Sequence, residues 1–200
     1  MTFEGWDDRP IHHYRQATYI VGDFFEELTA SVFSADRLRV RTGCVCPDAV
    51  RGSLYFESKA VTRRRGHTVL YQDRLDKYAT MMSEVEGRLL YVFWIHGAPI
   101  KDCRFKSELL EALANNILGG YVIEWTHVHT YARTHLRLET SSAMPDFYRF
   151  KPCDMRKLRP VQTLYLDPQE VYGHQTDPLE MVLAGATVWR KLFLRGEYER

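Results

Sequence analysis

Two short segments combine acidic and basic residues in a spacing that could act on a phosphate. Pro47-Asp48 is followed, nine positions after the aspartate, by Glu57-Ser58-Lys59. Side chains alternate along a strand, so Glu57 and Lys59 share one face. If the two segments are the arms of a hairpin, Asp48 faces that pair. Two carboxylates placed this closely raise each other's pKa unless a cation offsets their charge.

A divalent cation would remove that cost. Asp48 and Glu57 offer hard oxygen ligands, and Mg²⁺ binds through one or two carboxylates plus a substrate phosphate. Lys59 could then polarise the attacking water or stabilise charge that develops on phosphorus. We therefore expect Mg²⁺, with Mn²⁺ as the alternative. The simpler interpretation is an exposed Glu57–Lys59 ion pair that contributes about 0–1 kcal/mol, which leaves Asp48 without a role.

Pro47, Asp48, Glu57, Ser58 and Lys59 resemble the signature of the PD-(D/E)XK nucleases, the restriction-endonuclease-like superfamily. This resemblance implies a metal-dependent endonuclease that hydrolyses DNA phosphodiester bonds and leaves a 5′-phosphate. It implies that Asp48 and Glu57 hold the metal and that Lys59 acts in catalysis.

Two flanking features extend the resemblance over residues 21–96. Gly22 and Glu26 resemble the G-x-x-x-E of the first helix in many members, which implies Glu26 as an auxiliary catalytic acid and metal ligand. Gln72 resembles a glutamine that several branches place beside the active site. The layout is similar to archaeal-type Holliday junction resolvases, although this chain has about a hundred further C-terminal residues. It departs from the Q-x-x-x-Y branch because Tyr78 follows Gln72 by six positions.

The elements that must position these residues follow from periodicity. Apolar residues at helical spacing predict a helix over 20–33, and alternation predicts a strand over 37–41. The remaining expected elements are strands over 44–49, 53–61, 89–95 and 121–138, helices over 72–86, 104–118 and 177–195, and an irregular stretch over 140–176 with a short strand at 162–166. This order predicts an α/β fold: an αβββαβ restriction-endonuclease-like core, a mixed central sheet flanked by helices, with a C-terminal α+β extension.

Length and composition limit the number of domains and exclude a membrane span. A chain of 200 residues that is 45% hydrophobic suits one domain over residues 1–200. We expect the catalytic core over 20–96 and the rest of the sheet and the addition over 97–200. The longest apolar run, residues 89–95, is far shorter than the roughly 20 residues of a membrane span. With no signal-peptide pattern at the start, we expect a cytoplasmic protein without membrane contact, its four cysteines reduced.

Binding to DNA must rely on local patches, because the formal net charge is only +1. Arg63, Arg64 and Arg65 lie between the Lys59 strand and the next helix, where they could contact phosphates. Arg41, with Arg37 and Arg39, forms a second candidate stripe, and Arg51 lies in the hairpin turn. A solvated loop is the alternative for these arginines.

Three histidines form a further candidate group. His127, His129 and His135 would share one face if their segment is a strand, and the first two could then share a metal ion. A polar exposed face is the alternative interpretation.

The most direct hypothesis is a Mg²⁺-dependent deoxyribonuclease with DNA as its partner, and a homodimer if both strands are cut, since one site cuts one strand. The alternative is a catalytically silent nucleic-acid-binding or structural module of the same fold. A nuclease that acts on RNA or on free ends is a third option.

Overall fold

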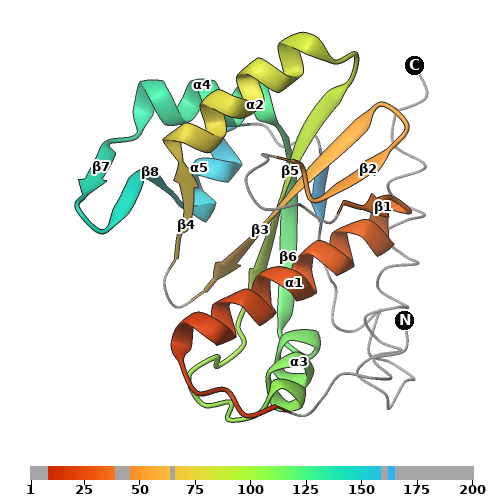
Figure 1. Ribbon diagram of the computed structural model, residues 1–200, viewed down its shortest axis with the longest axis vertical. Coiled ribbons are helices and arrows are strands. Elements are labelled where there is room, and N and C mark those ends of the chain that lie inside the picture. Colours follow the sequence, from red (N-terminus) through yellow and green to blue (C-terminus); the bar gives the residue numbers. More distant parts are fainter. Residues whose placement is uncertain (1–8, 39–45, 64–65, 159–161, 165–200) are drawn as a thin grey trace.

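The computed structural model describes residues 9–38, 46–63, 66–158 and 162–164, and shows a central mixed sheet flanked by helices (Figure 1). The elements are α1 (Tyr14–Phe33), β1 (Asp36–Arg37), β2 (Ala49–Arg51), β3 (Leu54–Thr62), β4 (Thr68–Tyr71), α2 (Gln72–Glu84), β5 (Arg88–His96), α3 (Lys106–Ala114), β6 (Ile117–Glu124), α4 (Trp125–His135), β7 (Leu138–Ser141), β8 (Met144–Phe150), α5 (Pro152–Lys157) and β9 (Gln162–Leu164). The predicted α/β class and the order of the core elements are confirmed.

The central sheet has the strand order β1-β2-β3-β5-β6-β9. Strands β2 and β3 form an antiparallel hairpin, whereas β3 and β5 run parallel, joined through α2. The hairpin register pairs Ala49 with Phe56. Asp48, which directly precedes β2, donates its backbone N–H to the Phe56 carbonyl at 2.8 Å, so this acid lies against the part of β3 that carries Glu57.

Two apolar cores lie on the two faces of this sheet. Helices α1 and α3 bury their apolar sides on one face, and α2, α4 and α5 cover the other. Figure 1 shows α1 crossing in front of the strands. On β5, Leu90 and Trp94 point into the first core while Tyr91 and Phe93 point into the second. A strand that is covered on both faces explains the unbroken apolar run in this part of the sequence.

Several element bounds differ from the prediction. Helix α1 begins at Tyr14 rather than at residue 20, because Ala17 continues its buried stripe one turn further back. Helix α3 is shorter than 104–118, and it ends at Ala114. The strands expected over 37–41 and 44–49 are reduced to β1 and β2 within the described residues.

The strand predicted over 121–138 is wrong. Strand β6 ends at Glu124, and residues 125–135 form helix α4. Val128 and Ala132, four residues apart, are both fully buried against the sheet, and this spacing belongs to a helix. The many β-branched and aromatic residues of the segment misled the prediction, since tertiary burial overrides such propensities.

A second, three-stranded sheet of order β4-β8-β7 stands beside the central one. Its strands β7 and β8, followed by α5, occupy most of residues 140–157, so the expectation of an irregular stretch from residue 140 is wrong there. The short strand expected at 162–166 is confirmed as β9 over Gln162–Leu164. The helix expected over 177–195 lies outside the described residues.

A buried hydrogen-bond chain fixes α1 to the sheet. The indole N–H of Trp94 on β5 donates to Thr29 Oγ1 at 2.8 Å, and the Thr29 hydroxyl donates to Ser58 Oγ on β3 at 3.1 Å. Thr29 is fully buried. Since Ser58 lies between Glu57 and Lys59, this chain also sets the helix against the candidate site.

Replacing Thr29 by valine is expected to lower the free energy of unfolding by about 1–3 kcal/mol, because the Trp94 N–H would lose its acceptor in a place that water cannot reach. Urea unfolding measures this loss. Thr130→Val, at an exposed position on α4, is the matched control and should change stability little. A Thr29→Val protein as stable as the wild type would contradict the structural role of the chain.

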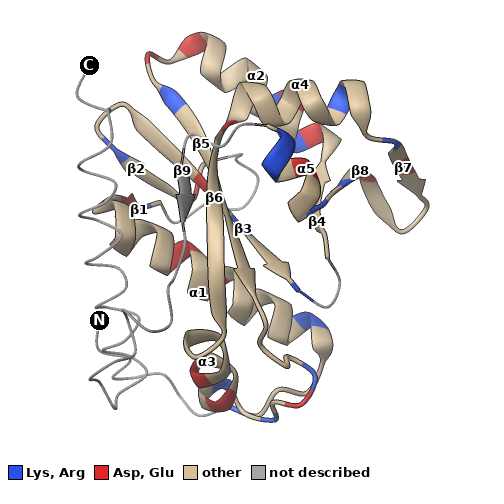
Figure 2. Ribbon diagram, turned by 180° about the vertical axis from the view of Figure 1, so that it is seen from behind, with Lys and Arg blue, Asp and Glu red and all other residues tan. Residues whose placement is uncertain are grey.

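Acidic and basic positions are interspersed along the ribbon rather than gathered on one element (Figure 2). No helix in the described part of the chain combines the length and the apolar character that a bilayer-spanning segment requires. Cys103 and Cys153 form no disulfide with a described residue.

Candidate active site

Asp48 is a buried acid next to the hairpin. Its Oδ2 accepts a hydrogen bond from the Ser58 backbone N–H at 2.7 Å, which holds it against β3. Burial raises the pKa of the Asp48 carboxyl to about 7, and the negative charge of Glu57 adds to this effect against the opposing charge of Lys59. Near neutral pH the carboxyl therefore lies close to the midpoint of its titration, and a cation beside it would favour the ionised form.

Glu57 is fully buried but is surrounded by donors. The Lys59 ammonium and the Arg74 guanidinium both donate to Oε1, the latter at 3.1 Å, and the Tyr78 hydroxyl donates to Oε2. Burial opposes ionisation of Glu57, yet the charges of Lys59 and Arg74 outweigh it, and the pKa lies below its ordinary value. Glu57 is thus a carboxylate held in one orientation.

Lys59 connects this acid pair to a cleft of about 580 Å³. The cleft runs between α1 and β4 along the exposed edge of β3, and Ser58, Lys59, Glu26 and Arg74 lie at one part of its wall. The Lys59 side chain is 18% exposed. A phosphate that enters the cleft can therefore approach the Lys59 ammonium, while Glu57 stays enclosed behind it.

Glu26 lines the same cleft, but its carboxylate has another partner. Arg37 donates to Glu26 Oε2 at 2.8 Å and also pairs with Asp23 and with Glu27, so that one guanidinium meets three acids of α1. Within the described residues, no three histidine, cysteine, aspartate or glutamate side chains form a group that could hold a metal. The structure therefore does not assemble Glu26 with Asp48 and Glu57 as a three-acid ligand set.

The two remaining carboxylates fit a hard divalent cation. Asp48 and Glu57 lie close enough for their charges to interact, and one or two carboxylates are the usual protein contribution to a Mg²⁺ site. Burial and the charge of Glu57 raise the pKa of Asp48 despite the charge of Lys59, and a divalent cation beside it would favour the ionised form. Binding through Glu57 would require Lys59 or Arg74 to release part of its hold on Oε1.

The sequence analysis did not predict two residues of the site around Glu57, Arg74 and Tyr78. Gln72 opens α2 as expected, but it is not among the residues that line the cleft, whereas Arg74 is. One turn further, Tyr78 is fully buried on the same helix, and burial followed by the charge of Glu57 raises its pKa. The spacing of Arg74 and Tyr78, four residues on one helix face, is the signal that could have identified them.

The arginines expected to bind DNA do not form one patch within the described residues. Arg63 follows β3 at its exposed end, whereas Arg51 lies at the other end of that strand, where its guanidinium donates to the Phe33 carbonyl at 3.3 Å. Arg64, Arg65, Arg39 and Arg41 lie outside the described residues. Arg37, expected beside them, is bound to the acids of α1.

The prediction that His127, His129 and His135 share one face of a strand is wrong. His127 and His129 lie on helix α4, and residues two apart on a helix point in different directions. His129 contacts the Trp125 ring, and His135 stacks on Tyr131 with ring centroids 4.6 Å apart. His129 and His135 therefore have aromatic partners, and no metal-ligating group of three or more side chains in the described part of the chain includes these histidines.

Comparison with known proteins gives one structural similarity. No family model matches the chain, and no curated protein matches it in sequence. The structure of Hjc, a Holliday junction resolvase from the archaeal hyperthermophile Archaeoglobus fulgidus, is similar over 81% of this chain and 99% of its own, with 15% sequence identity and a TM-score of 0.36. At this TM-score, the similarity does not transfer residue roles between the two chains.

His96, the last residue of β5, is a buried polar group that the sequence prediction did not include. It is fully buried and lines the cleft, and neither ring nitrogen has a hydrogen-bond partner in the structure as described. Burial lowers its pKa to about 4, so the imidazole is neutral near pH 7. Its ring lies 5.3 Å from that of Phe25.

Replacing His96 by phenylalanine is expected to raise the free energy of unfolding by about 1–2 kcal/mol, because an aromatic ring of similar shape removes two unpaired polar atoms. Chemical denaturation near pH 7 tests this. His127→Phe, at an exposed position of α4, should leave stability nearly unchanged. A marked loss of stability in His96→Phe alone would show that the nitrogens have partners in solution.

Proposed function

We propose that this protein is a metal-dependent endonuclease of the restriction-endonuclease-like superfamily that hydrolyses phosphodiester bonds in DNA. One observation carries the proposal: a buried aspartate, Asp48, lies close enough to a buried glutamate, Glu57, for their charges to interact, and Lys59 connects the pair to an open cleft. Burying two carboxylates together costs free energy. The pKa of Asp48 is raised and that of Glu57 is lowered, and such opposite shifts are typical of catalytic sites.

Asp48 and Glu57 would hold the metal ion, Mg²⁺ or Mn²⁺, with Glu26 as an auxiliary acid if Arg37 releases it. When bound, the ion would polarise the phosphodiester and offset the charge that develops there. The acids themselves are oriented by the chain, Asp48 by the Ser58 N–H and Glu57 by the Tyr78 hydroxyl.

Lys59 is the group that meets the reacting phosphate. Its ammonium donates to Glu57 and reaches the cleft, so it can donate a hydrogen bond to the attacking water or to a phosphoryl oxygen. Arg74, which also lines the cleft and contacts Glu57, holds a second positive charge nearby. Hydrolysis on this arrangement would leave a 5′-phosphate.

The DNA backbone would be held by arginines around the cleft. Arg63 at the end of β3 is one described candidate, and Arg64 and Arg65 follow it directly in the chain. Arg41, and Arg51 at the other end of β3, are the remaining candidates. Contacts to phosphates make affinity fall steeply with salt. Since one site cuts one strand, we expect a homodimer for cleavage of a duplex or a junction.

A specific observation favours a second candidate, a nucleic-acid-binding module without catalysis. Lys59, Arg74 and Tyr78 together occupy both oxygens of Glu57, so the chain neutralises this acid without a metal. A protein of this kind would bind DNA but would not respond to Mg²⁺.

Cleavage assays separate the two candidates. Supercoiled plasmid, linear duplex and a four-way junction are incubated with wild type, Asp48→Ala and Lys59→Ala in Mg²⁺, Mn²⁺ or EDTA. If the protein is a nuclease, the wild type cuts DNA only with metal, and both variants stay folded but no longer cut. DNA binding without cutting in any metal would support the silent module, and absence of both would exclude a role in DNA processing.

A further inference from the structure

The cleft extends well beyond the acid pair. From Lys59 to Thr62, β3 advances three residues, about 10 Å, and the cleft follows it to His96 and to the start of α1. We call the part between Lys59 and His96 the cleft arm; its walls are Thr18 and Gly22 of α1 on one side and β4 on the other. The whole volume of about 580 Å³ falls within the roughly 300–1,000 Å³ of pockets that enclose small molecules. A nucleoside fits such a space, whereas a duplex does not.

The floor of the cleft arm offers hydrogen bonds that the described chain does not use. Strand β2 begins at Ala49, opposite Phe56, so none of the described strands pairs with β3 on that side from Ser58 to Thr62. The Ser58 N–H points to this side, because it donates to Asp48, and residues two apart in a strand direct their N–H and C=O the same way. The main-chain groups of Ala60 therefore face the cleft arm.

His96 adds a buried, unpaired side chain at the end of this floor. It lies opposite Thr62 in the β3–β5 register, and neither of its ring nitrogens bonds to a described residue. A neutral imidazole has one donor and one acceptor, as does the peptide group of Ala60. Rotation of the His96 ring toward the cleft would let an occupant satisfy both groups.

The charges of the lining favour a neutral polar occupant. The cations Lys59 and Arg74 and the acid Glu26 lie at the acid-pair end. Among the described lining residues, no lysine, arginine, aspartate or glutamate lies next to Thr62 and His96. A phosphate would be expected to meet cations, whereas a nucleobase needs donors, acceptors and apolar or aromatic walls.

We propose that the cleft arm receives the base of one unpaired or extruded nucleotide while its phosphate lies at Lys59. This inference rests on the proposed nuclease function and specifies its substrate class: DNA with an unpaired nucleotide beside the cut. The cleft does not recognise base pairs elsewhere in the substrate.

A larger side chain at position 22 should block the cleft arm without preventing folding. A Cβ added at Gly22 meets no atom within 4 Å, so a side chain at this position projects into open space at the cleft wall. Leucine also has a higher helix propensity than glycine. Ser31→Leu, at an exposed position of the same helix outside the cleft, is the matched control.

Wild type, Gly22→Leu and Ser31→Leu are compared on three DNAs: a paired duplex, the same duplex with one extra unpaired nucleotide, and that duplex with the extra nucleotide abasic. Binding is measured without divalent metal, and cleavage with Mg²⁺. Stacking and hydrogen bonding of one base should strengthen wild-type binding to the unpaired DNA about tenfold, and the abasic DNA should lose this gain. Gly22→Leu should lose it as well, and Ser31→Leu should retain it.

The fluorescent base 2-aminopurine, placed at the unpaired position, reports whether the base enters the cleft arm. Its emission should change on binding to wild type but not on binding to Gly22→Leu. Equal affinity of wild type for all three DNAs, with cleavage intact, would overturn the base site and leave the nuclease proposal standing. An unpaired-DNA preference that Gly22→Leu retains would equally overturn it. Absence of cleavage on every DNA would instead mark failure of the nuclease function on which the inference rests.

Discussion

Replacing Lys59 by methionine is expected to lower the rate of DNA cleavage about a hundred- to a thousandfold. The methionine keeps the apolar stem but removes the ammonium group that contacts Glu57 at the wall of the cleft. Loss of a single preorganised charge or donor at a developing oxyanion commonly has an effect of this size. Single-turnover cleavage of the best substrate in Mg²⁺ measures it.

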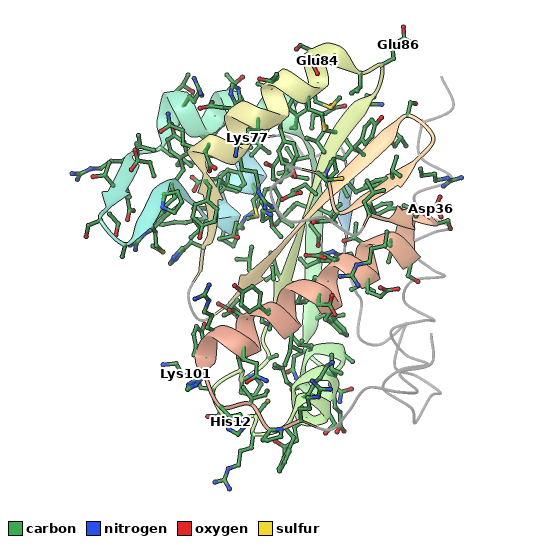
Figure 3. The ribbon with its side chains drawn as sticks, in the orientation of Figure 1. His12, Asp36, Lys77, Glu84, Glu86 and Lys101 are labelled. Carbon is green, nitrogen blue, oxygen red and sulfur yellow. The ribbon has the colours of Figure 1, made fainter. Side chains whose placement is uncertain are left out.

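Lys77→Met is the matched control for this substitution. Lys77 lies on α2, pairs with Asp73 at 3.6 Å and is 57% exposed (Figure 3). Its variant should cut DNA at the wild-type rate. If Lys59→Met, shown to be folded by circular dichroism, also cuts within threefold of wild type, Lys59 has no part in the reaction.

Replacing Asp48 by asparagine is expected to abolish cleavage and, at the same time, to stabilise the metal-free protein at pH 8 by about 2–3 kcal/mol. Burial, with the charge of Glu57, raises the pKa of Asp48 from 3.8 to about 7. A group whose pKa is raised in the folded state binds more protons there, so the folded protein loses stability as the pH rises from about 4 through 7. Asparagine stays neutral and keeps an oxygen for the Ser58 N–H.

Urea unfolding in EDTA at pH 5 and at pH 8 tests this prediction. The two proteins should be similar at pH 5, and Asp48→Asn should be the more stable at pH 8. Added Mg²⁺ should stabilise only the wild type. The exposed control Asp146→Asn should show none of these differences, and an Asp48→Asn protein that is less stable at pH 8 would refute the raised pKa.

The parts of the fold that could be predicted from the sequence are those with strong periodicity or a tight turn. The buried stripe of α1 and the apolar run of β5 directly indicate which residues are buried. The turn at Arg51 and Gly52 joins β2 to β3, which brings Asp48 beside the strand that carries Glu57. All three features depend on residues close together in the chain.

The rest depends on packing between distant segments. Strand β4 has only four residues and is a strand because β8, far along the chain, pairs with it. Helix α4 follows β6 without a break, and only its contact with the sheet selects a helical period there. Likewise, the pairing of Arg37 with Glu26 follows from the packing of β1 on α1, which no local pattern encodes.

Plasmid nicking shows whether Asp48, Glu57 and Lys59 hydrolyse DNA with a divalent metal. Wild type and the double variant Asp48→Asn/Lys59→Met are incubated with supercoiled plasmid over a range of Mg²⁺ concentrations and in EDTA. We expect nicks with 5′-phosphate ends that form only with metal and only with wild type. Nicking in EDTA, or equal nicking by the double variant, would show that these three residues do not form a metal-dependent nuclease site.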